Sequence, residues 1–567
     1  MNNDHSGKGR PSPPEDDTAI ELDEMRQDDD ELDANQPLIA DDAVAVADAQ
    51  IAPQARITIR NAGHVIRFLT LSAGISGLLF GFDTGVISST LVSIGSDLSH
   101  RPLNTADKSL ITAITSLLAL FSAPSTGFLA DKYGRKSAIL CPALLFALGA
   151  IVQAFSFEVW TMALGRALVG AAVGVASGAV PMYITELAPA ELRGRLVTVQ
   201  SLFITGGQVV AYLIGWMFAA HPQGWRWMVG VGAIPAVLQL ILLFWMPETP
   251  RWLLQTGQDE RARHVLHQVF ATLPRNDRDR VVQHVLFSVR NEILAEDKPP
   301  LGEAASDDGT GFRATAKELI SVPANKRALI IAAGLQGLQQ LCGFNSLMYF
   351  SATIFSLVGF TSPIGTSLSI AATNFVFTVV AFAYIDSIGR RNILLRSIPF
   401  MALGLLACSI SFLFIHPNES QTSELDDTQR TGPWSIVLLC SLVFYVAAYA
   451  VGLGCVPWQQ SELFPLRVRS LGSGLATATN WSSNFFVGIT FLPMMSLLGA
   501  STTFLLYCLI CLGGWFCVWS IYPETAGLEL EEISSILKDS FGVSESIERF
   551  RHRRNTALNS NEGSDHT

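Results

Sequence analysis

The sequence predicts an all-α membrane protein with twelve transmembrane helices arranged in two halves of six. Of its 567 residues, 49% are hydrophobic and only 15% are charged, whereas soluble domains carry about 25% charged residues. Apolar stretches close to the ~20 residues that cross a bilayer recur along the whole chain. A polar stretch divides them after the sixth. These observations exclude a chain of soluble domains.

Five segments follow from this pattern. Residues 1–60 hold 15 acidic and 5 basic residues with little apolar mass, so we expect a disordered cytoplasmic tail. Residues 61–246 and 327–521 are predicted to be the six-helix halves, 247–326 a cytoplasmic linker with short helices, and 522–567 a second cytoplasmic tail. The spans are expected at about 66–93, 109–130, 137–157, 160–183, 196–219, 226–246, 328–358, 365–386, 393–415, 434–460, 470–496 and 499–521.

Basic residues in the loops predict the orientation. They follow the even-numbered spans two, four, six, eight and ten, for example at Lys132, Arg193, Arg251, Arg391 and Arg467. Because cytoplasmic loops carry the excess of Lys and Arg, both termini are expected to be cytoplasmic.

The two halves repeat one loop. Gly127–Lys136 reads GFLADKYGRK between spans two and three, and Asp386–Arg391 reads DSIGRR between spans eight and nine. Secondary transporters are often built from two such repeats, with a binding site near the membrane midplane. The repeat therefore indicates a transporter.

Six motifs in chain order resemble the sugar porter family of the major facilitator superfamily, over about residues 66–540. The two repeated loops are accompanied by Gly77–Ser88 (GLLFGFDTGVIS), Pro247–Leu254 (PETPRWLL), Ser461–Pro465 (SELFP) and Pro523–Ile533 (PETAGLELEEI). Within this family, the sequence of four stretches most resembles fungal myo-inositol transporters. They are Gly334–Phe355, Thr373–Thr378, Val456–Phe464 and Ala476–Trp481. The resemblance implies the major facilitator fold.

The resemblance also implies a function, which is proton-coupled symport of myo-inositol, or of a related polyol or sugar, across the plasma membrane by alternating access. A passive or proton-coupled hexose transporter and a transport-dead nutrient receptor are the alternatives. The sequence contains no G-x-x-x-x-G-K-[ST] loop and no enzyme constellation, so an existing gradient is expected to drive transport. The expected partners are the small substrate, protons and membrane lipid, with no cofactor, metal or nucleic acid.

Asp83 is the first candidate residue, because a carboxylate inside an apolar span must be paired or protonated. Arg166, at the start of span four, is its expected partner. The carboxylate binds protons differently when the guanidinium is near and when it has moved away, so the pair is a candidate for proton coupling. The alternative is a capping or packing role beside Thr84 and Gly85. The resemblance implies coupling, since proton-coupled sugar porters carry Asp here.

Uncharged amides inside the spans are the candidates for substrate recognition. Each amide offers both donors and an acceptor to a polyol, and an amide facing lipid would be costly. By resemblance, the predicted substrate-binding residues are Gln208, Gln339, Gln340, Asn345 and Asn480. Hydrogen bonding between helices is the alternative role for each of them.

Two further features bear on the substrate. Trp458 is expected to pack an aromatic face on the substrate ring, and Trp481 is a second candidate for this role. Hexose porters usually carry Gln at the position of Ser201, whereas here the amide is on the neighbouring Gln200. This difference argues against exact hexose recognition.

Charged residues at the cytoplasmic ends of the spans are candidates for an inner gate. They could form ion pairs across the two halves that break when the cytoplasmic side opens; simple positive-inside anchoring is the alternative. The set comprises Asp131, Arg135, Glu186, Arg193, Asp386, Arg390, Glu462 and Arg469.

The last expectations concern modification. Asn418 lies in an N-x-S sequon in the predicted external loop between spans nine and ten and is the glycosylation candidate. The 8 cysteines all lie in apolar segments, where they are expected to be packing residues and to form neither disulfides nor a metal site.

Overall fold

Helices occupy the positions of all twelve predicted spans in the computed structural model. It describes residues 63–297, 310–415, 432–454, 463–526, 528 and 530–564. The first half comprises α3 (His64–Ser93), α4 (Thr105–Ser122), α5 (Ser125–Tyr133), α6 (Arg135–Ala154), α7 (Val159–Leu187), α8 (Ala190–Phe218), α9 (Gly224–Gly230) and α10 (Ala233–Trp245). The second half comprises α15 (Pro323–Leu341), α16 (Phe344–Val358), α17 (Pro363–Ile388), α18 (Arg390–Phe414), α19 (Pro433–Val451), α20 (Leu466–Leu497) and α21 (Ala500–Ile521).

Three predicted spans are each built from two helices. Span two begins at a capping box, in which the Asn104 side chain accepts from the Asp107 backbone N–H and Asp107 accepts in return. It then bends by 55° between α4 and α5. Span six divides into α9 and α10, and span seven breaks between α15 and α16.

Length and hydropathy support membrane crossing. Among the described residues, ten helical segments are long and apolar enough to cross a bilayer, and the bent pair α4 and α5 makes an eleventh. The helix of span eleven, α20, is long enough, but over its described residues it is not apolar enough to count among these segments. Its sequence is interrupted by Ser, Thr and Asn residues. Because polar side chains are costly in lipid, we expect these residues of α20 to face the interior of the protein.

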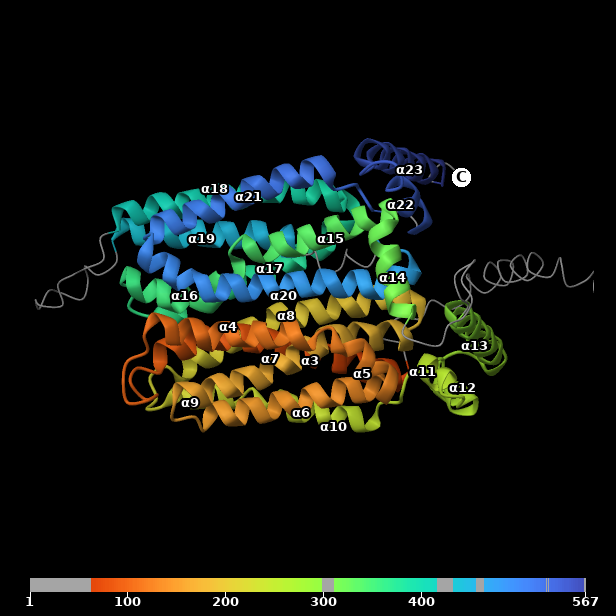
Figure 1. The fold of residues 1–567 in the computed structure, drawn as a ribbon, viewed down its shortest axis with the longest axis horizontal. Helices are drawn as coiled ribbons and strands as arrows, with labels where there is room; N and C mark the ends of the chain where they lie inside the picture. The colour runs from red at the N-terminus through yellow and green to blue at the C-terminus, as the bar shows by residue number, and fades with distance from the viewer. Residues whose placement is uncertain are drawn as a thin grey trace, which may run out of the picture. The chain divides into compact units, whose positions relative to one another are not determined.

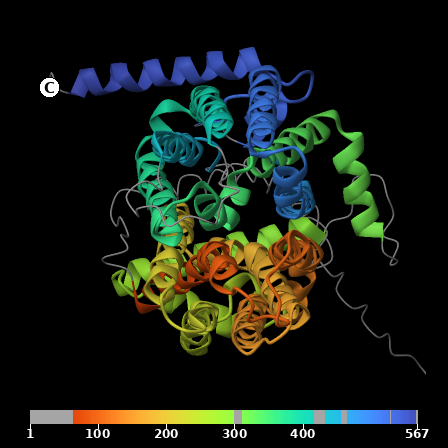
Figure 2. The same ribbon diagram turned by 90° about the vertical axis from the view of Figure 1, so that its left-hand side faces the viewer.

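The helices form two groups, which Figure 2 shows end-on, with the first half in orange and yellow and the second half in green and blue. Within the first half, α3 packs on α8 and α6 packs on α7; within the second, α18 packs on both α19 and α21. The halves meet where α4 packs on α20, α8 on α17 and α3 on α16. Candidate residues from distant parts of the sequence are thereby brought to one interface.

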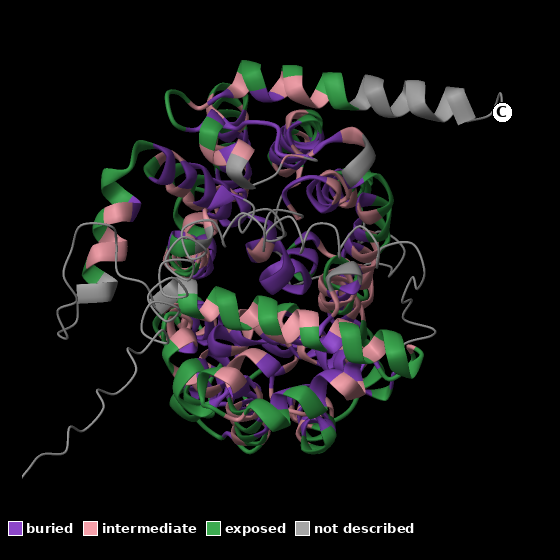
Figure 3. Ribbon diagram, turned by 90° about the vertical axis from the view of Figure 1, so that its right-hand side faces the viewer, coloured by how far each residue is buried: buried purple, intermediate pink, exposed green. Residues whose placement is uncertain are grey.

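The polar segments gather at one end of the bundle (Figure 1). They include α11 (Pro250–Gln255), α12 (Asp259–Val269), α13 (Arg275–Asp297), α14 (Thr310–Ser321), α22 (Leu530–Ile536) and α23 (Val543–Ser564). Viewed from this end, buried residues lie inside the two groups of helices, while α13 presents many exposed residues (Figure 3). Arg327 of α15 donates to the carbonyls of Leu537 and Lys538 at 2.7 Å each, which ties the segment after α22 to the second half.

Candidate functional site

Asp83 and Arg166 meet inside the first half. Asp83 lies within α3 and is 7% exposed, and Arg166 lies on α7 and is 1% exposed. Arg166 Nη1 donates to Asp83 Oδ1, while Arg166 Nε donates to the Ile111 carbonyl of α4 at 3.2 Å. Removing one partner of such a pair would leave an uncompensated buried charge, which is strongly destabilising. The arrangement therefore ties the charge state of Asp83 to the position of Arg166.

Four of the predicted substrate amides form one hydrogen-bonded chain in the second half. Asn345 Nδ2 donates to Gln340 Oε1 at 2.5 Å, and Gln340 Nε2 donates to Asn480 Oδ1 at 3.2 Å. Asn480 Nδ2 then donates to Gln339 Oε1 at 2.9 Å. Gln339 Nε2 ends the chain by donating to the Leu453 carbonyl at 2.9 Å. Since an amide has two N–H donors and two lone pairs, these side chains keep hydrogen-bonding capacity for a ligand.

Two amides that sequence reasoning missed belong to the same surroundings. Gln336 Oε1 accepts from Asn480 Nδ2 at 2.6 Å. Asn374 Nδ2, on α17, donates at 2.8 Å to Oε1 of the predicted residue Gln208 on α8. Both are buried. Each carried the signal that identified the other amides, an uncharged polar side chain within an apolar span.

Hydroxyl groups also join the two halves. Ser88 of α3 and Ser351 of α16 lie 3.1 Å apart at their Oγ atoms, and Ser88 Oγ accepts from the backbone N–H of Ala352 at 3.1 Å. Tyr212 of α8 donates to the Met348 carbonyl at 2.5 Å and lies 2.8 Å from Ser351 Oγ. These contacts hold α16 against the first half. None of the three side chains was singled out by the sequence reasoning as a site residue.

The two aromatic candidates have different outcomes. Trp481 of α20 is buried and packs edge-on against Phe80 of α3, with ring centroids 5.8 Å apart. Trp458 lies outside the described residues. Gln200 is half-buried on α8 and lines a cavity inside the first half, whereas the amide chain around Asn480 belongs to the second half.

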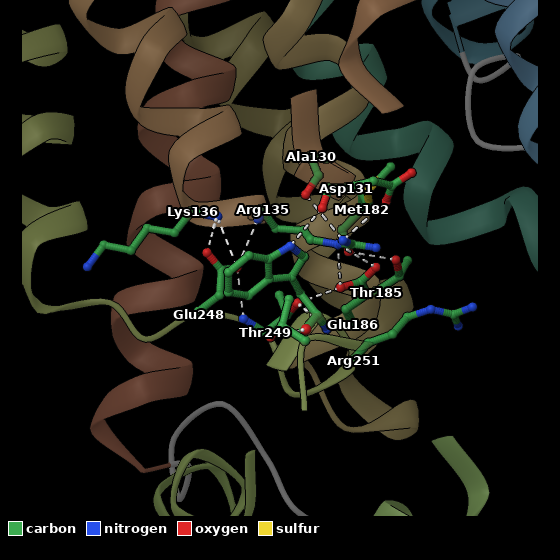
Figure 4. Close-up of polar contacts among 12 residues, drawn as sticks. Ala130, Asp131, Arg135, Lys136, Met182, Thr185, Glu186, Glu248, Thr249 and Arg251 are labelled. Atoms are coloured by element: carbon green, nitrogen blue, oxygen red, sulfur yellow. Dashed lines mark hydrogen bonds and ion pairs between the residues drawn. The ribbon is translucent and has the colours of Figure 1, made fainter. Parts of the chain in front are cut away.

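Arg135 forms two ion pairs with residues of its own half at the polar end of the first half (Figure 4). Arg135 Nη1 lies 3.2 Å from Asp131 Oδ1, and Arg135 Nε lies 3.0 Å from Glu186. Thr249 Oγ1 donates to Glu186 Oε2 at 2.6 Å. Arg135 thus pairs within its own half, whereas the sequence predicted pairs across the two halves. The reason is that α6 packs on α7, which brings Glu186 of α7 next to Arg135, the first residue of α6.

Glu248 accepts hydrogen bonds at the start of α6. Its carboxylate accepts from the backbone N–H groups of Arg135 at 2.9 Å and Lys136 at 3.1 Å. Glu524 occupies the matching place in the second half, where it accepts from Arg390 N at 2.9 Å and Arg391 N at 3.1 Å. Burial raises the pKa of both carboxyls, although the backbone donors oppose this rise. A carboxylate at a helix N-terminus also complements the helix dipole.

The remaining predicted gate residues are only partly described. Arg193 Nε donates to the Ala188 carbonyl at 3.2 Å, and Arg469 Nε donates to the Phe464 carbonyl at 3.3 Å. Glu462, the side chain of Asp386 and the sequon residue Asn418 lie outside the described residues.

The helical positions in two halves, with an ion pair buried in one half and an amide chain in the other, define a multi-pass membrane transporter of the major facilitator fold. The family model for the "Sugar (and other) transporter" family matches residues 69–537, and the chain belongs to this family. Two similar proteins are Myo-inositol transporter 2 of Schizosaccharomyces pombe and Myo-inositol transporter 1 of Saccharomyces cerevisiae. The first is 44% identical over 86% of this chain and 84% of its own. The second is 43% identical over 84% of this chain and 80% of its own.

Solved structures of the xylose transporter XylE, one of them described as the E. coli protein, share the fold. The inward open conformation of XylE aligns with a TM-score of 0.66 and 26% identity, covering 82% of this chain and 98% of that one. A XylE structure described as a proton:xylose symporter bound to 6-bromo-6-deoxy-D-glucose aligns with a TM-score of 0.65 and 26% identity, covering 83% and 98%.

Proposed function

We propose that this protein is a proton-coupled symporter of myo-inositol, located in the plasma membrane with both termini in the cytoplasm. Two similar proteins at 44% and 43% identity are named myo-inositol transporters, and both alignments span most of each chain. The amide chain suits a polyol, because a ring carrying several hydroxyls needs both donors and acceptors from the protein. Gln208, Gln339, Gln340, Asn345, Trp458 and Asn480 are the proposed substrate-binding residues.

The buried Asp83–Arg166 pair is the observation that carries the proposed proton coupling. The carboxyl is charged and paired when Arg166 is near, and protonation becomes favourable when the guanidinium moves away in an apolar surrounding. Each transport cycle would therefore take up one proton at Asp83 and release it on the other side. A structural neighbour is described as a proton:xylose symporter, which supports this reading.

Alternating access requires one closed side at a time. In the proposed orientation, the contacts of Ser88 and Tyr212 with α16 lie toward the exterior and close that side. The proposed inner gate consists of the charged residues at the cytoplasmic ends, including Asp131, Arg135 and Glu186. Its members would exchange partners as the two halves rock. The same motion would affect the amide chain, because Gln339 joins this chain to the Leu453 carbonyl just beyond the end of α19.

Uptake by the purified full-length protein in liposomes tests the proposal. Labelled myo-inositol should accumulate above its external concentration when the exterior is acidic, and a trapped pH dye should report acidification of the interior. A protonophore should abolish the accumulation. Uptake that only equilibrates would identify a passive transporter. Preference for a hexose in a competition panel would reject the inositol assignment, and an absence of transport with retained binding would favour a receptor.

A further inference from the structure

A cavity of about 50 Å³ lies inside the first half, on the same face of α3 as Asp83. Leu79 and Phe80 line it, and they precede Asp83 by four and three residues, which places all three on one helix face. The nearest lining residue of α3, Phe80, is therefore about 4.5 Å along the helix axis from Asp83, since each residue rises about 1.5 Å. Arg166 has the same relation to the cavity on α7, because the lining residue Val173 follows it by two turns.

One wall of this cavity carries an unsatisfied polar atom. Gln239 of α10 is 1% exposed, and its Nε2 donates to Ser72 Oγ of α3 at 2.8 Å. Its Oε1 is buried and accepts no hydrogen bond from any described group. Such an atom in an apolar interior costs free energy unless a water supplies the missing donor. Gln239 therefore points to a hydrated site.

The cavity is large enough for buried water, and four of its sixteen lining residues have polar side chains, while the others are apolar. A buried water needs roughly 10–15 Å³ and two to four polar partners, so the cavity has room for a small cluster. Besides Gln239, the polar side chains that line it are Ser76, Ser177 and Gln200. Among the described lining residues none is ionisable. A proton that crosses this space must consequently travel on water.

The cavity has a buried floor and a more accessible side. Its lining residues on α6 and α10, such as Phe146 and Gln239, are buried. Ser76, Ser177 and Gln200 are half-buried. Phe80, on the same side, touches Trp481 of the second half. The cavity thus extends from the interior of the first half toward the surface that faces the second half.

We propose that this cavity binds a chain of water molecules through which Asp83 releases its proton toward the cytoplasm, separately from the substrate amides. In this step the O–H bond of the protonated Asp83 carboxyl breaks and the proton passes to the nearest water. The charge then moves along the chain past Gln239, and a proton leaves at the half-buried side near Gln200. The carboxylate that remains pairs again with Arg166. The inference rests on the proposed proton symport.

Two variants test it in different ways. Gln239→Leu removes the acceptor, and Ala143→Leu fills the cavity from α6, where Ala143 is buried. In liposomes, both should slow substrate-driven acidification roughly tenfold, equivalent to about 1.4 kcal/mol on the barrier. Exchange of labelled for unlabelled substrate across the membrane needs no proton release and should stay near the wild-type rate. Leu144→Phe, on the 50% exposed neighbouring position, is the matched control and should change neither rate.

The outcomes separate this inference from the proposed function. If the wild type transports without acidifying the interior, proton symport itself is wrong. If the wild type acidifies and both cavity variants acidify at the same rate, the water path is wrong while symport stands. Loss of exchange together with acidification in both variants would also overturn the inference, since it would show a structural role for the cavity.

Discussion

The two halves share a fold plan but bury different chemistry within the membrane. The first half buries a carboxylate and a guanidinium, Asp83 and Arg166. In the second half, the corresponding interior carries uncharged amides such as Gln340 and Asn480. A buried charge is sensitive to small changes of distance and protonation, whereas amides bind neutral hydroxyls without a change of charge. We therefore predict that mutations in the two halves separate the proposed proton coupling from the proposed substrate recognition.

At their polar ends the halves are alike. Gly134 and Gly389 both have a φ of 92°, a left-handed conformation that favours glycine. A Cβ at Gly134 would lie 2.3 Å from the Glu248 carboxylate, and one at Gly389 would lie 2.6 Å from that of Glu524. Both glycines therefore admit a carboxylate to the start of the next helix. The repeated loop motif is explained by this shared contact.

The second basic residue of the repeated loop makes similar contacts in both halves. Lys136 Nζ donates to the Phe244 carbonyl at 3.4 Å, near the end of α10. Its counterpart Arg391 donates to the carbonyls of Val518 at 2.7 Å and Trp519 at 2.8 Å, at the end of α21. Both side chains therefore bind backbone carbonyls at the end of the last spanning helix of their own half.

The largest effect is expected from Asp83→Asn. The variant cannot give up a proton, so uphill accumulation of myo-inositol should disappear while exchange of bound substrate continues. Transport in liposomes with and without an inward proton gradient measures both quantities. Asp107→Asn, which changes a carboxylate paired with Arg101 at the start of α4, should keep accumulation. Proton-dependent accumulation by the Asp83 variant would show that the first half does not carry the coupling.

Variants of the amide chain should lower substrate affinity and leave proton coupling intact. Gln340→Ala and Asn345→Ala each remove hydrogen bonds worth about 1–2 kcal/mol, so substrate affinity should fall roughly tenfold while coupling persists. Equilibrium binding of labelled myo-inositol to the purified protein measures the affinity. Ser482→Ala, at an exposed position on α20, is the matched control. Unchanged affinity in both amide variants would remove the recognition role from the second half.

The smallest effect is expected from changing Glu248 or Glu524, the carboxyls that accept hydrogen bonds at the starts of α6 and α18. Because burial raises the pKa of Glu248 and Glu524 above the ordinary value of 4.5, the folded protein holds these protons more tightly than the unfolded chain. Their contribution to stability is present at low pH and is lost as pH rises through the folded-state pKa. Glu248→Gln and Glu524→Gln should each flatten this slope in thermal unfolding measured across acidic pH. Glu260→Gln, at an exposed position of α12, should not. A wild-type slope in both variants would show that neither carboxyl titrates differently on folding.

Much of the candidate site was visible in the sequence, because polar residues inside apolar spans stand out. Asp83, Gln340 and Asn480 were found in this way. Gln336 and Asn374 carried the same signal and were missed, because they lay outside the positions carried over from the family. The contact of Ser88 could not be found, since serine hydroxyls often bond within their own helix. The contact of Tyr212 could not be found because its partners on α16 are distant in sequence.

The sequence by itself determined the membrane class, the positions of the spans, the repeated loops and the identity of the buried polar groups. These follow from local properties, since hydropathy and helix length are set by consecutive residues. Only the tertiary structure decided the partners. Asn374 meets Gln208 from the other half, Arg135 pairs within its own half, and Gln239 Oε1, at the cavity near Asp83, has no donor among the described residues. Such contacts depend on how helices distant in sequence pack together, which no local pattern specifies.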